Sequence, residues 1–241
     1  DLRKRHRRPT PLIGGYGVLL GLVLGLAFSG LLVQPLWWAL LGATVLLTLM
    51  GSVDDVRHIP ASVRFLVQGL IVGTALWSGG VVIKELGLLL GSEAIHLIWP
   101  AGLAFTILCS LASINAYNMI DGIDGLAASL AGLSLLGILA LSLGVGATGL
   151  ALLAGFLVLA LLAFMAFNLE LPGFRKRKIF LGDGGSTALG FLVVCFLVIG
   201  SQDSLSLRPI TAVWLAGLPI LDMLALFLRR AFAGQSPFHA D

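Results

Sequence analysis

Long stretches without a charged residue are the feature that most constrains how this chain can fold. Six run without interruption and a seventh contains only Asp222; they cover 12–33, 35–53, 65–83, 97–114, 125–169, 184–202 and 209–228. A helix needs about 20 apolar residues to cross the hydrocarbon core of a bilayer. The fifth stretch is long enough for two crossings and has a glycine-rich break at 144–149, so the sequence predicts eight membrane helices.

The composition supports a chain that lies mostly in lipid. Only 11% of the 241 residues are charged, against about 25% in a typical soluble domain, and 58% are hydrophobic. Cys109 and Cys195 lie inside apolar stretches without the spacing of metal ligands, which favours small buried hydrophobic side chains. We therefore expect an all-α integral membrane protein, a polytopic helical bundle in which residues 1–241 form a single transmembrane domain.

Basic residues are distributed unequally over the polar segments that eight alternating crossings define. Lys84 and Arg208 fall on one side, and the other 13 of the 15 lysines and arginines fall on the opposite side. The positive-inside rule makes the basic side cytoplasmic. Five aspartates share that side, in loops or at helix ends: Asp54, Asp55, Asp121, Asp124 and Asp183. The sequence therefore predicts a site on the cytoplasmic face.

Three segments on that face, 51–55, 115–130 and 180–186, combine aspartates with glycines. One such motif alone is typical of an ordinary loop, in which aspartate caps a helix and glycine forms the turn. The adjacent Asp54–Asp55 pair is different, because neighbouring carboxylates at a membrane helix end raise each other's pKa unless a cation offsets them. Oxygen ligands of this kind suit Mg²⁺. Basic residues on the same face fit phosphate oxygens, and they serve equally as topology determinants.

The segment 115–130 places four polar side chains at intervals of three: Asn115, Asn118, Asp121 and Asp124. On a straight helix each step of three drifts by about 60°, so the first and last would point in opposite directions. They converge only if the helix ends near Asn118 and if Gly122 and Gly125 let the chain turn. This spacing predicts a site at the membrane surface, where a water-borne ligand meets a lipid-borne one.

These motifs resemble those of the polyprenyl-phosphate N-acetylhexosamine-1-phosphate transferases. The matching segments follow the family order through nearly the whole chain: 3–6, 11–15, 54–55, 115–126, 180–186, 229–230 and 236–238. The resemblance implies Mg²⁺-dependent transfer of a sugar-1-phosphate from a UDP-sugar to a polyprenyl phosphate in a bacterial inner membrane, with UMP leaving. The segment 210–230 is most similar to the branch that transfers GlcNAc-1-phosphate to undecaprenyl phosphate, which initiates O-antigen and related cell-envelope polysaccharides.

The resemblance also implies roles for individual residues. Asp183 and Asn118 are expected to bind Mg²⁺, for which Mn²⁺ is an alternative. Phe180 is expected to stack on uracil with Asp124 near the uridine, and Asn115, Arg229 and Arg230 complete the substrate-binding set. The expected catalytic residues, beside the metal, the diphosphate and the lipid phosphate, are Asp54, Asp55, Asp121 and Asp183.

Several alternatives stay open at this stage. The donor sugar is GlcNAc, or else FucNAc, GalNAc or MurNAc-pentapeptide, and transfer is direct or passes through an aspartyl phosphate. A membrane transporter is disfavoured, because only Asp222 lies within a predicted crossing and the other acids gather on one face. Family members begin one helix earlier and continue into a histidine-rich loop, so we expect both parts to be missing here. No nucleic-acid partner is expected, and a homodimer is one alternative for the oligomeric state.

Overall fold

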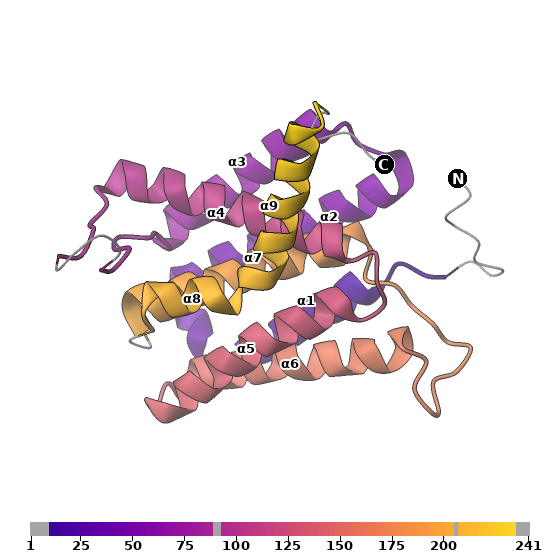
Figure 1. Cartoon of the computed structure of the whole chain (residues 1–241). Helices are drawn as coiled ribbons and strands as arrows, with labels where there is room; N and C mark the ends of the chain where they lie inside the picture. Colours follow the sequence, from indigo (N-terminus) through magenta and orange to yellow (C-terminus); the bar gives the residue numbers. More distant parts are fainter. Residues whose placement is uncertain (1–9, 89–92, 205–206, 235–241) are drawn as a thin grey trace.

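The computed structural model describes residues 10–88, 93–204 and 207–234, and this part of the chain is a helical bundle (Figure 1). The motif segments 3–6 and 236–238 lie outside it. The helices run in chain order: α1 (Gly14–Ser29), η1 (Leu31–Val33), α2 (Pro35–Arg57), α3 (Ala61–Gly79), α4 (Trp99–Ile120), α5 (Leu126–Gly144), α6 (Thr148–Asn168), α7 (Gly182–Ile199), η2 (Gly200–Ser204), α8 (Pro209–Leu215) and α9 (Gly217–Phe232).

Six of these helices, α2 to α7, are long and apolar enough to cross a membrane. The α8–α9 pair passes the same test as one bent span, which gives up to seven crossings. The remaining predicted stretch forms α1, a shorter apolar helix of 16 residues. The protein is thus an all-helical polytopic membrane protein in the part described, and the count of eight crossings stays a prediction.

The crossing predicted over 209–228 is a broken helix, formed by the α8–α9 pair. The chain bends by 71° between α8 and α9. Pro219 explains the break, because a proline cannot donate to the carbonyl four residues earlier and its ring clashes with that carbonyl. That group, the Leu215 carbonyl, instead accepts a hydrogen bond of 2.7 Å from the Ser134 hydroxyl of α5. A neighbouring helix therefore satisfies the backbone group that the break leaves open, as a membrane interior requires.

Helix α7 is the centre of the bundle. Of the apolar window that marks its span, 94% is buried, against 22% for α3 at the periphery. Helices α1, α2, α4 and α5 all contact α7, which lies between them in Figure 1. A helix that is apolar on every side is expected to be buried on every side. The core therefore forms around α7, and its N-terminus is held by several neighbours.

Glycines bring the α7 backbone into direct contact with α1 and α2. A Cβ on Gly51 of α2 would lie 2.4 Å from the Gly184 nitrogen, and one on Gly15 of α1 would lie 2.6 Å from the Gly185 nitrogen. Small residues at crossings are the usual means by which membrane helices approach closely. On the α4 side, the Ser113 hydroxyl donates a 2.8 Å hydrogen bond to the Gly190 carbonyl. These contacts fix the position of α7 along its own axis relative to α1, α2 and α4.

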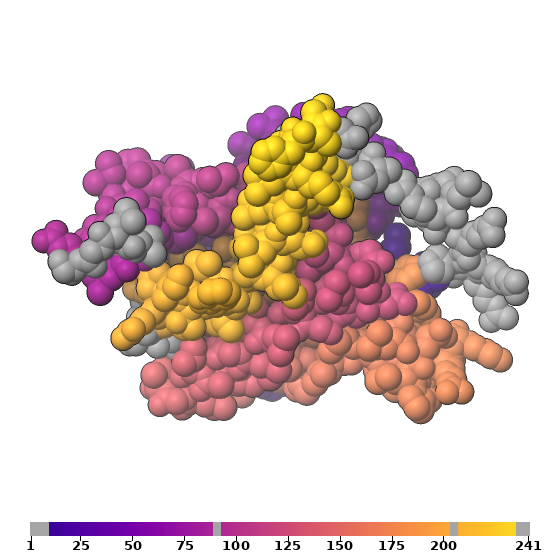
Figure 2. All heavy atoms as spheres, in the orientation of Figure 1, coloured from indigo at the N-terminus to yellow at the C-terminus, as the bar shows by residue number. Residues whose placement is uncertain are grey.

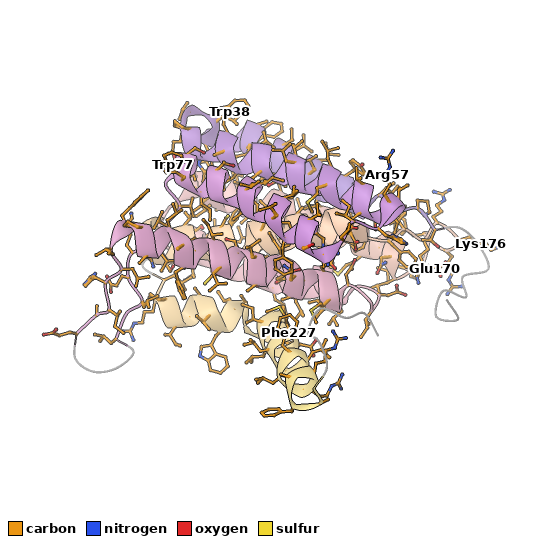
Figure 3. All side chains as sticks on the ribbon, turned by 90° about the horizontal axis from the view of Figure 1, so that it is seen from above. Trp38, Arg57, Trp77, Glu170, Lys176 and Phe227 are labelled. Carbon is orange, nitrogen blue, oxygen red and sulfur yellow. The ribbon has the colours of Figure 1, made fainter. Side chains whose placement is uncertain are left out.

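The two ends of the bundle differ in chemistry. Figure 3 shows Trp38 and Trp77 at one end and Arg57, Glu170 and Lys176 at the other. The aromatic end also carries the predicted excursion 84–96. Its two arms pair, since the Leu86 nitrogen donates to the Ile95 carbonyl at 2.9 Å. Helices α2 and α4 end at the basic end, where α3, α5 and α7 begin.

Candidate active site at the helix ends

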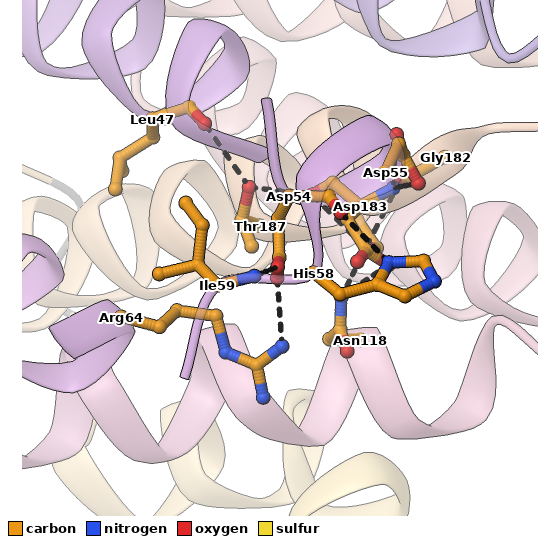
Figure 4. A network of polar contacts seen from close by, with 11 residues as sticks. Leu47, Asp54, Asp55, His58, Ile59, Arg64, Asn118, Gly182, Asp183 and Thr187 are labelled. Atoms are coloured by element: carbon orange, nitrogen blue, oxygen red, sulfur yellow. Dashed lines mark hydrogen bonds and ion pairs between the residues drawn. The ribbon is translucent and has the colours of Figure 1, made fainter. Parts of the chain in front are cut away.

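Asp55, in the last turn of α2, faces the first turn of α7. Its two carboxylate oxygens accept the Asp183 backbone N–H at 3.2 and 3.1 Å (Figure 4). The N-terminus of a helix favours negative charge, because its first N–H groups lack partners within the helix. Gly182 makes room for this contact: its φ is +76°, and a Cβ there would lie 2.9 Å from Asp55 Oδ2. Helix α7 begins at Gly182, inside the glycine-rich motif, and Asp183 lies in its first turn.

Asn118 and Asp183, which the family resemblance groups as metal ligands, are in contact although 65 residues separate them. The Asn118 side-chain amide donates to Asp183 Oδ1 at 3.0 Å and to the Ser186 hydroxyl at 3.1 Å. Asn118 lies in the last turn of α4, which ends at Ile120. The ends of α2, α4 and α7 are therefore tied together through the backbone and side chain of one aspartate.

Asp121 follows directly after α4 and adds a further carboxylate to this cluster. Burial, followed by the nearby charges of Asp183, Asp55 and Asp124, raises the pKa of Asp121 to about 7. An acid held this way lacks sufficient positive charge around it. A cation bound beside these carboxylates would lower the pKa of Asp121 again.

The residues present fit Mg²⁺ when the ion arrives with phosphate ligands. Within the described ranges, no three His, Cys, Asp or Glu side chains are grouped closely enough to form a metal site by themselves. Mg²⁺ usually takes one or two carboxylates and completes its shell with water and substrate phosphates. The carboxylate of Asp183 and the amide of Asn118, beside the Asp121 carboxyl, supply ligands of that type.

The raised pKa of Asp121 predicts a pH-dependent stability in the absence of divalent cations. An unfolded aspartate ionises near pH 4 and the folded one at about 7. The folded state therefore loses stability as the pH rises through this window, and the penalty is complete above it. In EDTA, Asp121→Asn should raise the melting temperature by about 5 °C at pH 8 and by much less at pH 5. An equal difference at both pH values would contradict the assignment.

The adjacent residues Asp54 and Asp55 contact different parts of the protein. Asp54 is only 4% exposed; its Oδ1 accepts the Ile59 N–H at 2.6 Å, and its Oδ2 forms an ion pair with Arg64 at 2.9 Å (Figure 4). Both partners belong to the connection between α2 and α3 or to the first turn of α3. Asp54 thus fastens that connection, whereas Asp55 contacts the first turn of α7. The catalytic roles predicted for both residues remain predictions.

A double-mutant cycle tests the fastening role of Asp54. Asp54→Asn and Arg64→Met should each destabilise the protein by about 1–3 kcal/mol, because each leaves a partly buried partner without its counter-charge. The double variant should be less destabilised than the sum of the two, since neither charge is then left alone. Thermal unfolding in detergent measures the cycle. Strict additivity would show that the ion pair contributes nothing.

Two residues predicted to bind the nucleoside, Asp124 and Phe180, are linked by a third. The ammonium of Lys178 forms an ion pair with Asp124 and lies 5.3 Å from the centroid of the Phe180 ring. The backbone of Phe180 is held against the start of α1, where Gly14 N–H donates to its carbonyl at 2.9 Å. In the sequence, Lys178 was grouped with the basic residues that fit phosphate oxygens or set topology, and its contacts with Asp124 and Phe180 were not predicted. Its position two residues before Phe180 was the available signal.

Other predicted residues lie further from this cluster or behave differently. The Asn115 amide donates to the Leu111 carbonyl of its own helix at 2.7 Å. Arg229 and Arg230 lie in the last turn of α9, and Arg229 lines a cavity of about 350 Å³ together with Asp222. The predicted glycine hinge is half right, because Gly125 has a positive φ of 72° and Gly122 does not.

An apolar groove opens beside Asp121. It has a volume of about 310 Å³ and runs between the connection of α4 to α5 and the first turns of α9. Helix α9 forms a ridge over this face in Figure 2. The lining residues are mostly aliphatic: Met119, Ile120, Gly122, Ile123, Leu126, Leu130, Leu218, Pro219 and Asp222.

The fold and the site together define a class of protein: a polytopic helical membrane protein with an acidic site at one end of its bundle. Residues 37–201 match the model of glycosyl transferase family 4, and the chain belongs to that family. The match includes the whole acidic cluster and Phe180, whereas Asp222, Arg229 and Arg230 lie beyond it. The predicted family resemblance is confirmed.

Curated relatives carry one shared name, undecaprenyl-phosphate alpha-N-acetylglucosaminyl 1-phosphate transferase. The Salmonella typhi protein is 34% identical over 242 residues, which cover 100% of this chain and 65% of the relative. The Yersinia pestis and Haemophilus influenzae proteins are each 33% identical, and the chain covers 66% and 68% of their lengths. The chain therefore spans about two thirds of the length of the relatives that it matches.

Proposed function

We propose that the protein transfers GlcNAc-1-phosphate from UDP-GlcNAc to undecaprenyl phosphate and releases UMP, at the first step of a cell-envelope polysaccharide. The observation that carries this proposal is the junction at Asp183, where the ends of α2, α4 and α7 meet through Asp55 and Asn118. The relatives' name adds the acceptor and the transferred group, undecaprenyl phosphate and N-acetylglucosaminyl 1-phosphate. The family resemblance adds the UDP donor.

In the proposed reaction, an oxygen of the lipid phosphate attacks the β-phosphorus of the UDP-sugar. The bond from that phosphorus to the bridging oxygen breaks, and UMP leaves with the electron pair. Phosphoryl transfer of this kind depends mostly on positioning and charge neutralisation. A phosphate monoester loses its second proton near pH 6, so much of the acceptor is already a dianion at pH 7. The demand on a general base is therefore small.

The residues of the cluster have different proposed roles in binding the metal, orienting α7 and receiving the substrates. Asp183 and Asn118 would hold Mg²⁺, which when bound supplies positive charge to the diphosphate oxygens. Asp55, fixed on the Asp183 N–H, orients the first turn of α7 and so the Asp183 carboxylate. The apolar groove beside Asp121 suits part of an isoprenoid chain whose phosphate reaches the acids. A water-borne donor and a lipid-borne acceptor thus approach the same helix ends.

A donor panel tests the proposed function directly. Full-length protein is incubated with Mg²⁺, undecaprenyl phosphate and radiolabelled UDP-GlcNAc, UDP-GalNAc, UDP-FucNAc or UDP-MurNAc-pentapeptide, and label is counted in the lipid phase. Label from UDP-GlcNAc with one UMP released per transfer is expected. Label from a different donor alone would correct the sugar, and no label from any donor would contradict the proposal.

The proposed cytoplasmic orientation of the site makes a topology prediction. In a background without Cys109 and Cys195, His58→Cys and Lys176→Cys should be shielded from an impermeant thiol reagent in intact cells. Ser204→Cys should react, because residue 204 follows α7 at the opposite end of the bundle from Arg57 and Lys176 (Figures 1 and 3). Labelling at position 176 from outside would reverse the orientation.

A further inference from the structure

Lys178 lies beside Phe180 and Asp124, the residues that the family resemblance implies for binding the nucleoside. Its ammonium pairs with Asp124, which follows α4, and also lies over the ring of Phe180, which precedes α7. The side chains of Lys178 and Asp124 are 24% and 44% exposed, so both can be reached from water. One flexible cation therefore holds together two residues from different loops.

A base that stacks on the exposed face of an aromatic ring competes with a cation on that face. A cation over the ring of a partly exposed aromatic residue shifts an equilibrium by about two- to fivefold. The lysine stem has four carbons and rotates readily, so the ammonium can move without a change in the backbone. Once it leaves Asp124 and the ring, it needs another anionic partner. The phosphates are the anionic groups that an incoming nucleotide brings.

We propose that Lys178 is a donor-recognition residue that exchanges partners when nucleotide binds. In the ligand-free protein its ammonium covers Phe180 and neutralises Asp124. When a uracil base takes the ring face, the ammonium moves to a phosphate of the same ligand. This inference rests on the proposed function and adds Lys178 to the residues that recognise the donor. A nucleoside without a phosphate must displace the ammonium from Phe180 and Asp124 without offering it a new anionic partner.

The exchange makes opposite predictions for a nucleoside and a nucleotide. Lys178→Met keeps the length of the side chain and removes its charge. Uridine should then bind about two- to fivefold more tightly, because the Lys178 ammonium no longer competes for the ring. The preference for UMP over uridine should fall by at least about twofold, because the phosphate loses an ion pair. Lys178→Arg should keep the wild-type pattern, since guanidinium also lies well over aromatic rings.

Lys176→Met provides the matched control. It removes the same charge from the same loop, but Lys176 contacts Glu170 through its backbone N–H and projects outward from the bundle (Figure 3). Its loss should weaken UMP slightly by general electrostatics and leave uridine unchanged. Circular dichroism and melting curves establish that each variant is folded before the titrations are compared.

Isothermal titration calorimetry of full-length protein with uridine and with UMP, each in the presence of Mg²⁺, tests the exchange of partners by Lys178. Tighter uridine binding and a reduced UMP preference in Lys178→Met alone support the exchange. If wild-type protein binds UMP but Lys178→Met leaves both affinities unchanged, the exchange is wrong and the proposed function stands. Weaker uridine binding in Lys178→Met would make the lysine a direct ligand of the base, which also overturns the exchange. Failure of wild-type protein to bind UMP overturns both.

Discussion

Asp183→Asn is expected to lower sugar-phosphate transfer by about two to three orders of magnitude, because it removes several kcal/mol of metal-assisted charge stabilisation. The substitution is well matched to the structure. An asparagine oxygen can still accept the Asn118 amide, and the bond from residue 183 to Asp55 uses the backbone N–H, which is unchanged. The variant therefore removes charge and leaves the helix junction in place.

Initial rates measured over a range of Mg²⁺ concentrations separate a metal role from a structural one. Asn118→Ala should raise the Mg²⁺ concentration needed for half-maximal rate as well as lowering the rate, because it removes the proposed neutral ligand of the ion. Melting curves should show Asp183→Asn folded as wild type. Near-normal transfer by Asp183→Asn at millimolar Mg²⁺ would place the metal elsewhere.

Gly51→Ala is expected to reduce transfer on the order of a hundredfold although the residue carries no functional group. The new Cβ would lie 2.4 Å from the Gly184 nitrogen and 2.5 Å from the Asp183 carbonyl carbon. Both are backbone atoms at the start of α7, so α2 and α7 must separate for the methyl group to fit. Asp55 follows one turn later on α2, and a displacement near 1 Å in a catalytic arrangement has effects of this size. Overpacking also destabilises by about 1–3 kcal/mol.

Gly42→Ala is the control for this effect. Gly42 lies on the same helix, and a Cβ there would meet nothing within 4 Å. The change should be neutral or slightly stabilising, since alanine is the better helix former. Transfer rate and melting temperature of the two variants are compared in the same detergent. If Gly51→Ala behaves as Gly42→Ala does, the close approach of α2 and α7 is wrong.

The arrangement of helices was largely accessible from sequence, because membrane helices are marked by apolar length. The positions of α2 to α7 follow the uncharged stretches closely. The break at Ala216 was missed because Pro219 sits inside an apolar run, where hydropathy gives no signal. Proline is tolerated at such a point only when another group satisfies the freed carbonyl. The Ser134 hydroxyl does so here, and sequence does not reveal that contact.

The sequence indicated which segments form the site, but it did not indicate which side chains contact one another there. The family resemblance grouped Asn118 with Asp183, and the fold brings them together because the end of α4 and the start of α7 lie at the same end of the bundle. Treating Asp54 and Asp55 as one unit missed their division, although adjacent residues on a helix point about 100° apart. The contacts of Lys178 were not predicted, because they come from residues 124 and 180, which only the folded chain brings together.

The burial of α7 has a consequence for biosynthesis. Ribosomes deliver α1 to α6 first, so the surfaces around Gly15, Gly51 and Ser113 must face lipid, or one another, until α7 leaves the translocation machinery. The centre of the bundle is filled, and Asp55 has the Asp183 N–H as its partner, only in a chain whose α7 is in place. Membrane insertion of the early helices and completion of the site are therefore separate steps. A quality-control protease that recognises exposed glycine-lined helix surfaces would distinguish chains before and after that step.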